Sequence, residues 1–199
     1  QEDFRGNAQN YFSAENSYLN RVLERRRGIP ITLALVYLSI AERIGLSAEG
    51  VSFPGHFLLR FKTAPDGLFD PFSGRTLSAS DCQTLLRQTQ GPRAQLEPKH
   101  TATANRRDLM MRLLENLKQC FWQQRTWSSA ELCLDQQRLL KPHQPALNLQ
   151  LGNIRELRGD LDSAKNIYAQ IIESSKASEI GQLAAQRLMA MGHSRKNIH

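Results

Sequence analysis

Two side chains of this sequence could together perform acid–base chemistry. His56 follows Pro54-Gly55, and Asp70 precedes Pro71. An imidazole oriented by a carboxylate is the base of many nucleophilic catalysts, and it is equally a structural pair that joins two strands. We expect these two side chains to lie within hydrogen-bonding reach, and a separation beyond about 6 Å would exclude the pair.

A catalytic pair of this kind needs a nucleophile, and the sequence offers two candidates. A neighbouring base could activate the hydroxyl of Thr32, although a Thr near a helix start more simply satisfies first-turn N–H groups. Cys82 lies near a predicted helix start, which can lower a thiol pKa, although a buried, inert thiol is the commoner case. A metal site is not expected, because His56 and Asp70 have no third ligand.

The element that must position these groups is the stretch from Gly28 to Gly45, GIPITLALVYLSIAERIG. It is apolar on nearly every side, and such a helix is normally buried in a domain core. Pro30 suits a first helical turn, Gly28 can close the preceding helix and Gly45 can end this one. The sequence therefore predicts a central buried helix, whose start offers free N–H groups to a nucleophile or an anion.

The first half of the chain has an α+β pattern. Residues 1–16 lack periodicity and are predicted as a loop, and a helix capped by Asn16 or Ser17 follows them. A short helix is expected to open at residues 80–82. Between the central helix and that helix we expect three strands of a small antiparallel sheet, at residues 51–53, 56–61 and 68–70. In the second of these strands one face carries Phe57, Leu59 and Phe61.

The pairing of the second and third strands decides whether the two candidate side chains meet. Residues 64–67 carry a turn signal between these strands. Pairing centred on Thr63 sets His56 opposite Asp70, whereas a tight turn centred on residues 65 and 66 sets Phe61 there. The sequence leaves both registers open.

The second half of the chain is helical in pattern. Residues 91–104 contain two prolines and no periodicity, which is typical of a linker. We therefore expect an α+β domain at residues 1–90 and a helical domain at residues 105–199. Positions in the helical part recur with a period of 34, which resembles the tetratricopeptide repeat. In its second copy small residues would let paired helices approach around an aromatic ring, at Gly152, Gly159, Ala164 and Tyr168.

Several motifs resemble the transglutaminase-like core of papain-type proteins. These are GIPITLA at residue 28, RIGL at residue 43, GH at residue 55 and DP at residue 70. More narrowly, FRGN, NSYLNRVLERRRGIPITLA, FPGHFLLR and FDPFSG resemble the bacterial SirB-one type family. Its members join this core to C-terminal tetratricopeptide repeats. The resemblance covers nearly all 199 residues and implies a transglutaminase-like (papain-like) α+β domain followed by an all-α array.

The resemblance also assigns roles to single residues. It matches His56 to the family's catalytic histidine and Asp70 to the residue that orients it. The family's cysteine, at the start of the central helix, matches Pro30. Proline has no ionisable group, so the Cys–His attack of this family is impossible at that position. The resemblance therefore implies a vestigial catalytic pair without its nucleophile.

The amino-acid composition indicates the cellular compartment and limits the classes of binding partner. Hydrophobic residues make up 40% and charged residues 23% of the chain, as in an ordinary globular protein. The net charge is +7, but no basic run exceeds residues 25–27 and no aromatic residues alternate with it, so nucleic-acid binding is not expected. Cys82, Cys120 and Cys133 have no paired spacing, which favours a reduced, cytoplasmic setting. We expect no cofactor and no membrane span.

These patterns, together with the resemblance, predict a catalytically inactive cytoplasmic protein that binds a protein or peptide partner or acts as a regulatory module. If the repeat register is right, a groove of the helical array carries Arg112, Glu115, Gln119, Trp122, Asn153 and Glu156. Trp122 could anchor a peptide there, or it could pack against the first domain. The alternative is an active enzyme for acyl transfer or amide hydrolysis, which would use His56 and Asp70 with Thr32, Cys82 or an unrecognised nucleophile.

Overall fold

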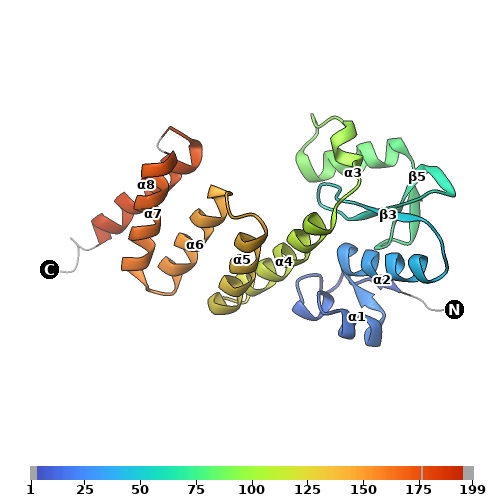
Figure 1. The fold of residues 1–199 in the computed structure, drawn as a ribbon, viewed down its shortest axis with the longest axis horizontal. Helices are drawn as coiled ribbons and strands as arrows, with labels where there is room; N and C mark the ends of the chain where they lie inside the picture. Colours follow the sequence, from blue (N-terminus) through green and yellow to red (C-terminus); the bar gives the residue numbers. More distant parts are fainter. Residues whose placement is uncertain (1–3, 176, 195–199) are drawn as a thin grey trace. The chain divides into compact units, whose positions relative to one another are not determined.

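The computed structural model describes residues 4–175 and 177–194, whose elements are drawn in Figure 1. The chain divides into two units between Asn116 and Leu117, inside helix α4 (Arg106–Gln123). The sequence placed this division earlier, in residues 91–104. That segment instead packs on the first unit: Ala94 and Leu96 contact its core, and the backbone N–H of Ala104 donates to Gly50. A stretch without periodicity can thus still be an integral part of a domain.

The central helix of the first unit is α2 (Pro30–Arg43), and its predicted position is confirmed. Gly45 ends it with a φ of +71°, as expected. The N-terminal half of α2 is buried, but Ile40 is 47% exposed and Ile44, directly after the helix, is 69% exposed. The prediction that the helix is buried on all sides is therefore wrong for its C-terminal part.

The role predicted for Gly28 is also wrong. The preceding helix α1 (Leu19–Arg25) ends at Arg26, which takes the left-handed conformation with a φ of +54°. Gly28 belongs to strand β2 (Arg27–Gly28), which pairs in parallel with β1 (Arg5–Gly6). A Cβ on Gly28 would lie 2.8 Å from Oγ1 of Thr32, so this position requires glycine for space.

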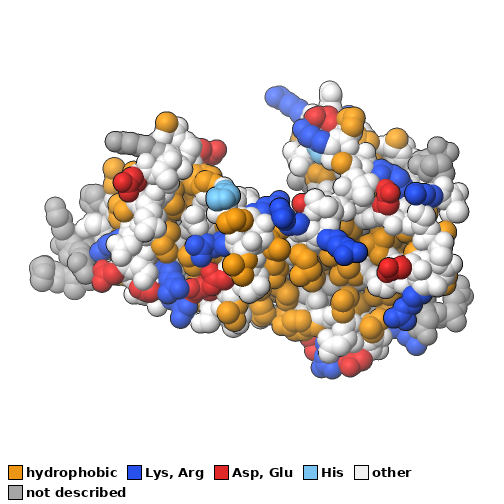
Figure 2. Space-filling view, in the orientation of Figure 1, with side chains coloured by type: hydrophobic (Ala, Val, Ile, Leu, Met, Phe, Trp, Pro, Cys, Tyr) orange, Lys and Arg blue, Asp and Glu red, His pale blue; other side chains and the backbone are white. Residues whose placement is uncertain are grey.

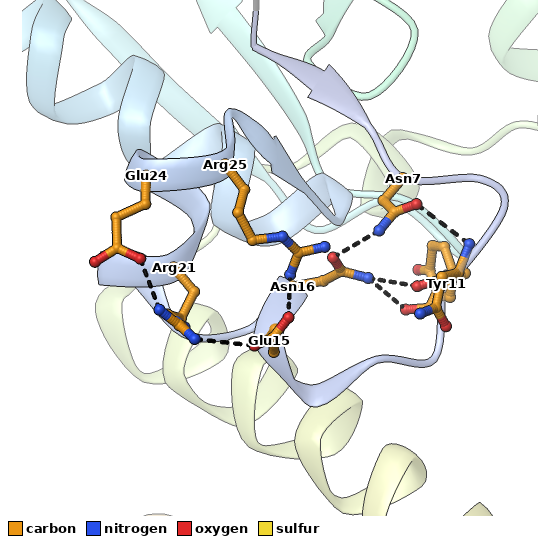
Figure 3. A network of polar contacts seen from close by, with 8 residues as sticks. Asn7, Tyr11, Glu15, Asn16, Arg21, Glu24 and Arg25 are labelled. Carbon is orange, nitrogen blue, oxygen red and sulfur yellow. Dashed lines mark hydrogen bonds and ion pairs between the residues drawn. The ribbon is translucent and has the colours of Figure 1, made fainter.

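The N-terminal loop is tied to this helical core through Asn16. Asn16 does not cap α1, whose first turn follows Tyr18 without a side-chain cap; it ends a short 3₁₀ helix (Ala14–Asn16) and is fully buried. Its amide nitrogen donates to the carbonyls of Asn10 and Tyr11, at 2.7 and 3.1 Å. Its amide oxygen accepts from Asn7 at 3.0 Å (Figure 3). Asn16 therefore holds the loop in one conformation.

Four antiparallel strands form the larger sheet of the first unit. In spatial order they are β3 (Ala48–Val51), β4 (Leu58–Phe61), β5 (Ala64–Asp70) and β6 (Arg75–Leu77). Helix α2 packs on one face with Phe57 and Leu59, and α3 (Ala79–Gln90) packs on the other with Leu58 (Figure 1). The alternation predicted for this strand is thus confirmed.

The turn predicted at residues 64–67 is wrong, because these residues lie within β5 and the chain turns at residues 62 and 63. A Cβ on Gly67 would lie 2.6 Å from the side chain of Thr76. This glycine therefore permits the close approach of β6 and does not make a turn.

The described residues of the second unit form helices and their connections. After α4 come α5 (Trp127–Leu140), α6 (Pro145–Leu157), α7 (Leu161–Ser175) and α8 (Glu179–Ser194), and neighbours from α5 onward pack in sequence. A Cβ on Gly152 of α6 would overlap the ring of Tyr168 of α7. The hydroxyl of Tyr168 lies 2.8 Å from Asn153 Oδ1 and 2.9 Å from Glu156 Oε2. The small residue and the aromatic ring thus meet, as the spacing predicted.

No helix within the described ranges combines the length and the apolar character that crossing a membrane requires.

Candidate functional site

The structure brings His56 and Asp70 together. Nδ1 of His56 lies 3.9 Å from Oδ1 of Asp70, inside the limit of about 6 Å set above but longer than a hydrogen bond. Both side chains are largely buried, with 23% and 7% exposed. Nδ1 is itself buried and has no hydrogen-bond partner among the described residues. The pair is therefore close, but the carboxylate does not hold the imidazole as a catalytic orienting residue would.

Neither of the two registers considered from the sequence places this pair. The backbone pairs Leu59 with Phe69 and Phe61 with Ala64, with an irregularity between these two pairs. Continuing the first pairing puts Asp70 level with residue 58, so the imidazole reaches the carboxylate from outside β4.

Tight turns position both side chains. His56 follows Gly55, whose φ is +75° and whose Cα leaves no room for a Cβ beside Thr89 of α3. The backbone N–H of His56 donates to Phe53 at 3.0 Å. Oδ1 of Asp70 accepts the backbone N–H of Phe72 at 2.9 Å, so Asp70 is also a turn residue.

Arg112 of α4 adds a charge beside this pair. Helix α4 rests on the first unit through Leu109 and Leu113, which pack against the cluster of Phe57 and Leu59. Burial lowers the pKa of His56; Asp70 opposes this effect, and the positive charge of Arg112 adds to it. The sequence placed Arg112 in a partner groove and gave no signal that it lies near His56. The lowered pKa favours the neutral imidazole, which is the form that a general base requires.

A lowered pKa makes the stability of the fold depend on pH. The unfolded chain, with a histidine pKa of about 6.5, binds more protons than the folded chain as the pH falls below that value. This part of the stability is present above the unfolded pKa and is lost on acidification. Urea unfolding would measure the free energy of unfolding at pH 7.5 and at pH 5. The decrease in this free energy between the two pH values should be smaller for His56→Gln than for wild type. His143→Gln, at an exposed histidine, should behave as wild type; a larger loss for His56→Gln would mean that Asp70 dominates.

Thr32, the first candidate nucleophile, is occupied by structural hydrogen bonds. Its Oγ1 donates to the backbone carbonyl of Asn16 at 2.7 Å and accepts the backbone N–H of Ile29 at 3.1 Å. The side chain is fully buried. Thr32 therefore completes the first turn of α2, which is the simpler role considered from the sequence.

Cys82, the second candidate, is packed in the apolar core on the α3 side of the sheet. It is 3% exposed and belongs to the cluster of Leu58 and Leu86. Burial, and secondarily the charge of Asp81, raise the pKa of its thiol. A protonated, buried thiol is a poor nucleophile. Cys120 and Cys133 are also free and buried, and no three potential metal ligands gather anywhere in the described part of the chain.

The six residues predicted for a partner groove are divided between the two units. Arg112 and Glu115 are half-buried in the first unit, and the other four lie in the second. Asn153 and Glu156 contact the hydroxyl of Tyr168 and so contribute to the packing of α6 on α7. Gln119 is exposed. The ring of half-buried Trp122 meets Trp127 edge-on, with centroids 5.4 Å apart.

Comparison with known proteins adds family information. A model of the transglutaminase-like superfamily matches residues 1–115. A UPF0162 protein of Xylella fastidiosa is 37% identical over 178 residues, which cover 83% of this chain and 63% of that protein. A UPF0162 protein of Vibrio cholerae is 27% identical over 192 residues, covering 96% of this chain and 71% of the relative.

F-box only protein 21 of Homo sapiens is 40% identical over 95 residues, 43% of this chain and 15% of that protein. Compared with the UPF0162 protein of Xylella fastidiosa, this chain spans about 63% of the relative's length. No solved structure gives a significant match.

Proposed function

This chain belongs to the transglutaminase-like superfamily, and from that premise we propose that it is a catalytically inactive member that binds a protein partner in the cytoplasm. One observation carries the proposal: the first turn of α2 is closed. Pro30 occupies the position at which the resemblance puts the family's cysteine, and it is buried together with Ile29 and Ile31. A substrate carbonyl therefore has neither a thiol to meet nor an open path to the start of the helix.

The remaining parts of the site favour the same proposal. An enzyme of this class needs an accessible nucleophile that its histidine can deprotonate. The hydroxyl of Thr32 is committed to Asn16, and the thiol of Cys82 lies in the apolar core. His56 and Asp70 then act as a buried polar pair between the turns that precede β4 and follow β5.

Thiol labelling tests the inactive state. We expect the thiol introduced by Pro30→Cys to react with iodoacetamide about as slowly as the three buried native cysteines, because the closed site would bury it. The folded protein would be labelled, and mass spectrometry of its peptides would then locate the label. Circular dichroism would verify the fold of each variant. Rapid labelling of the new thiol that is lost in Pro30→Cys/His56→Ala would overturn the closed-site argument. Labelling of wild type that depends on His56 would support the rival enzyme.

The partner surface is proposed within residues 117–199, around Gln119 and Trp122 on one side of α4. Trp122 is partly exposed and braced by Trp127, and a pre-ordered aromatic ring is a common binding anchor. A pull-down should capture a protein with wild type and lose it with Trp122→Ala. Leu139→Ala serves as the control, because Leu139 is 75% exposed on α5. Equal capture by Trp122→Ala and wild type would refute this surface.

A further inference from the structure

The exposed apolar side of α2 is the feature that the proposed function leaves unexplained. The sequence of α2 is apolar on nearly every side, yet Ile40 is 47% exposed. On α1, Leu19 is 40% and Leu23 is 54% exposed. Figure 2 shows hydrophobic side chains gathered over α1 and α2. Leu19, Leu23 and Ile40 line the same hollow, and exposed apolar side chains gathered in one place are a feature of interaction sites.

The shape of this surface suits a third helix. A hollow of about 300 Å³ lies between α1 and α2. Its walls include two rows of side chains spaced four residues apart, Leu19 and Leu23 on α1 and Val36 and Ile40 on α2. Side chains spaced four residues apart form a ridge on a helix, and the groove between two such ridges receives the ridge of another helix. The hollow can therefore accept apolar side chains at positions i and i+4 of a helix.

The charge at the rim specifies the partner further. Ser39 and Arg43 are the polar residues that line the hollow. Arg43 is exposed in the last turn of α2, and its guanidinium forms no ion pair or hydrogen bond with any residue in the described ranges. A guanidinium beside an apolar groove favours a carboxylate on whatever binds there.

We propose that this groove binds an amphipathic helix of a partner protein, with two apolar side chains four residues apart in the hollow and an acidic side chain against Arg43. The surface lies wholly within residues 4–43. It is therefore independent of the surface around Trp122, and either can fail without the other.

Selection from a peptide library tests this proposal on the full chain. The library would display helix-forming peptides of about 16 residues, with leucines fixed four positions apart and the outward positions varied. We expect selected peptides to carry Asp or Glu at one recurring position. Fluorescence polarisation should show their binding weakened by about ten-fold or more in Ile40→Glu and in Arg43→Glu. Leu139→Glu, at an exposed position of α5, should bind as wild type.

Charge reversal makes the test specific. A second selection against Arg43→Glu should enrich Lys or Arg at the position that held the acid. Arg43 is exposed, so this variant is expected to fold even if Ile40→Glu does not. The proposal is overturned if no helical peptide is enriched, or if neither Ile40→Glu nor Arg43→Glu weakens peptide binding. It is also overturned if sedimentation shows a dimer that Arg43→Glu dissociates, since the occupant would then be a second copy of this chain.

Discussion

Thr32→Val is expected to destabilise the first unit by about 2–6 kcal/mol. Valine has nearly the shape of threonine, so the loss comes from hydrogen bonding and not from a cavity. The substitution leaves two buried backbone groups without partners, the carbonyl of Asn16 and the N–H of Ile29. Each buried polar group left unpaired costs about 1–3 kcal/mol, and natural domains are stable by only about 5–15 kcal/mol.

Thr32→Ser is the matched control, because serine keeps the hydroxyl and removes only a methyl group. It should cost about 1 kcal/mol. Hydrogen exchange of the α2 amides is the appropriate measurement, since both tryptophans lie in residues 117–199 and fluorescence would not report on this unit. If the valine and serine variants exchanged equally fast, the hydroxyl would not have the structural role assigned to it.

Gly152→Val should destabilise the second unit by about 2–4 kcal/mol. A side chain at this position overlaps the ring of Tyr168, which is fully buried between α6 and α7. Displacing the ring also separates its hydroxyl from Asn153 and Glu156. Denaturant unfolding followed by tryptophan fluorescence would measure the loss.

Gly192→Ala provides the comparison for this prediction. Gly192 is exposed in α8, and a Cβ there meets nothing within 4 Å. Alanine is a better helix former than glycine by about 1 kcal/mol, so this variant should be as stable as wild type or slightly more stable. A Gly152→Val variant that unfolded at the wild-type midpoint would contradict the close packing of α6 on α7.

The sequence predicted the elements better than the surfaces that they present. Pro30 and Gly45 marked the two ends of α2 because each suits a backbone conformation required there. The apolar pattern could not reveal that nothing in the described chain covers Ile40, because exposure depends on neighbours distant in sequence. Gly67 was misread for a similar reason: its lack of a side chain accommodates Thr76 across the sheet.

The candidate site was predicted only in part. The family motifs identified His56 and Asp70, and the structure brings these side chains close together without a hydrogen bond. The contribution of Arg112 could not be predicted, since it depends on how residues 91–104 lead α4 onto the first unit. The contact between Gly152 and Tyr168 was predictable because the repeat spacing encodes it. Whether the helices form a tetratricopeptide array remains a prediction.

The hydrogen bonds of Asn16 bear on where the first domain begins. Asn7 is bonded to the side chain of Asn16, whose backbone carbonyl accepts the hydroxyl of Thr32 (Figure 3 shows the Asn7–Asn16 part). A fragment that started at Ser17 would keep every α-helix and all four strands of the antiparallel sheet, yet it would lose β1 and the acceptor for Thr32. The N-terminal segment is therefore interior to the folding unit, and a domain boundary drawn from the α-helices and the four-stranded sheet alone would cut it off.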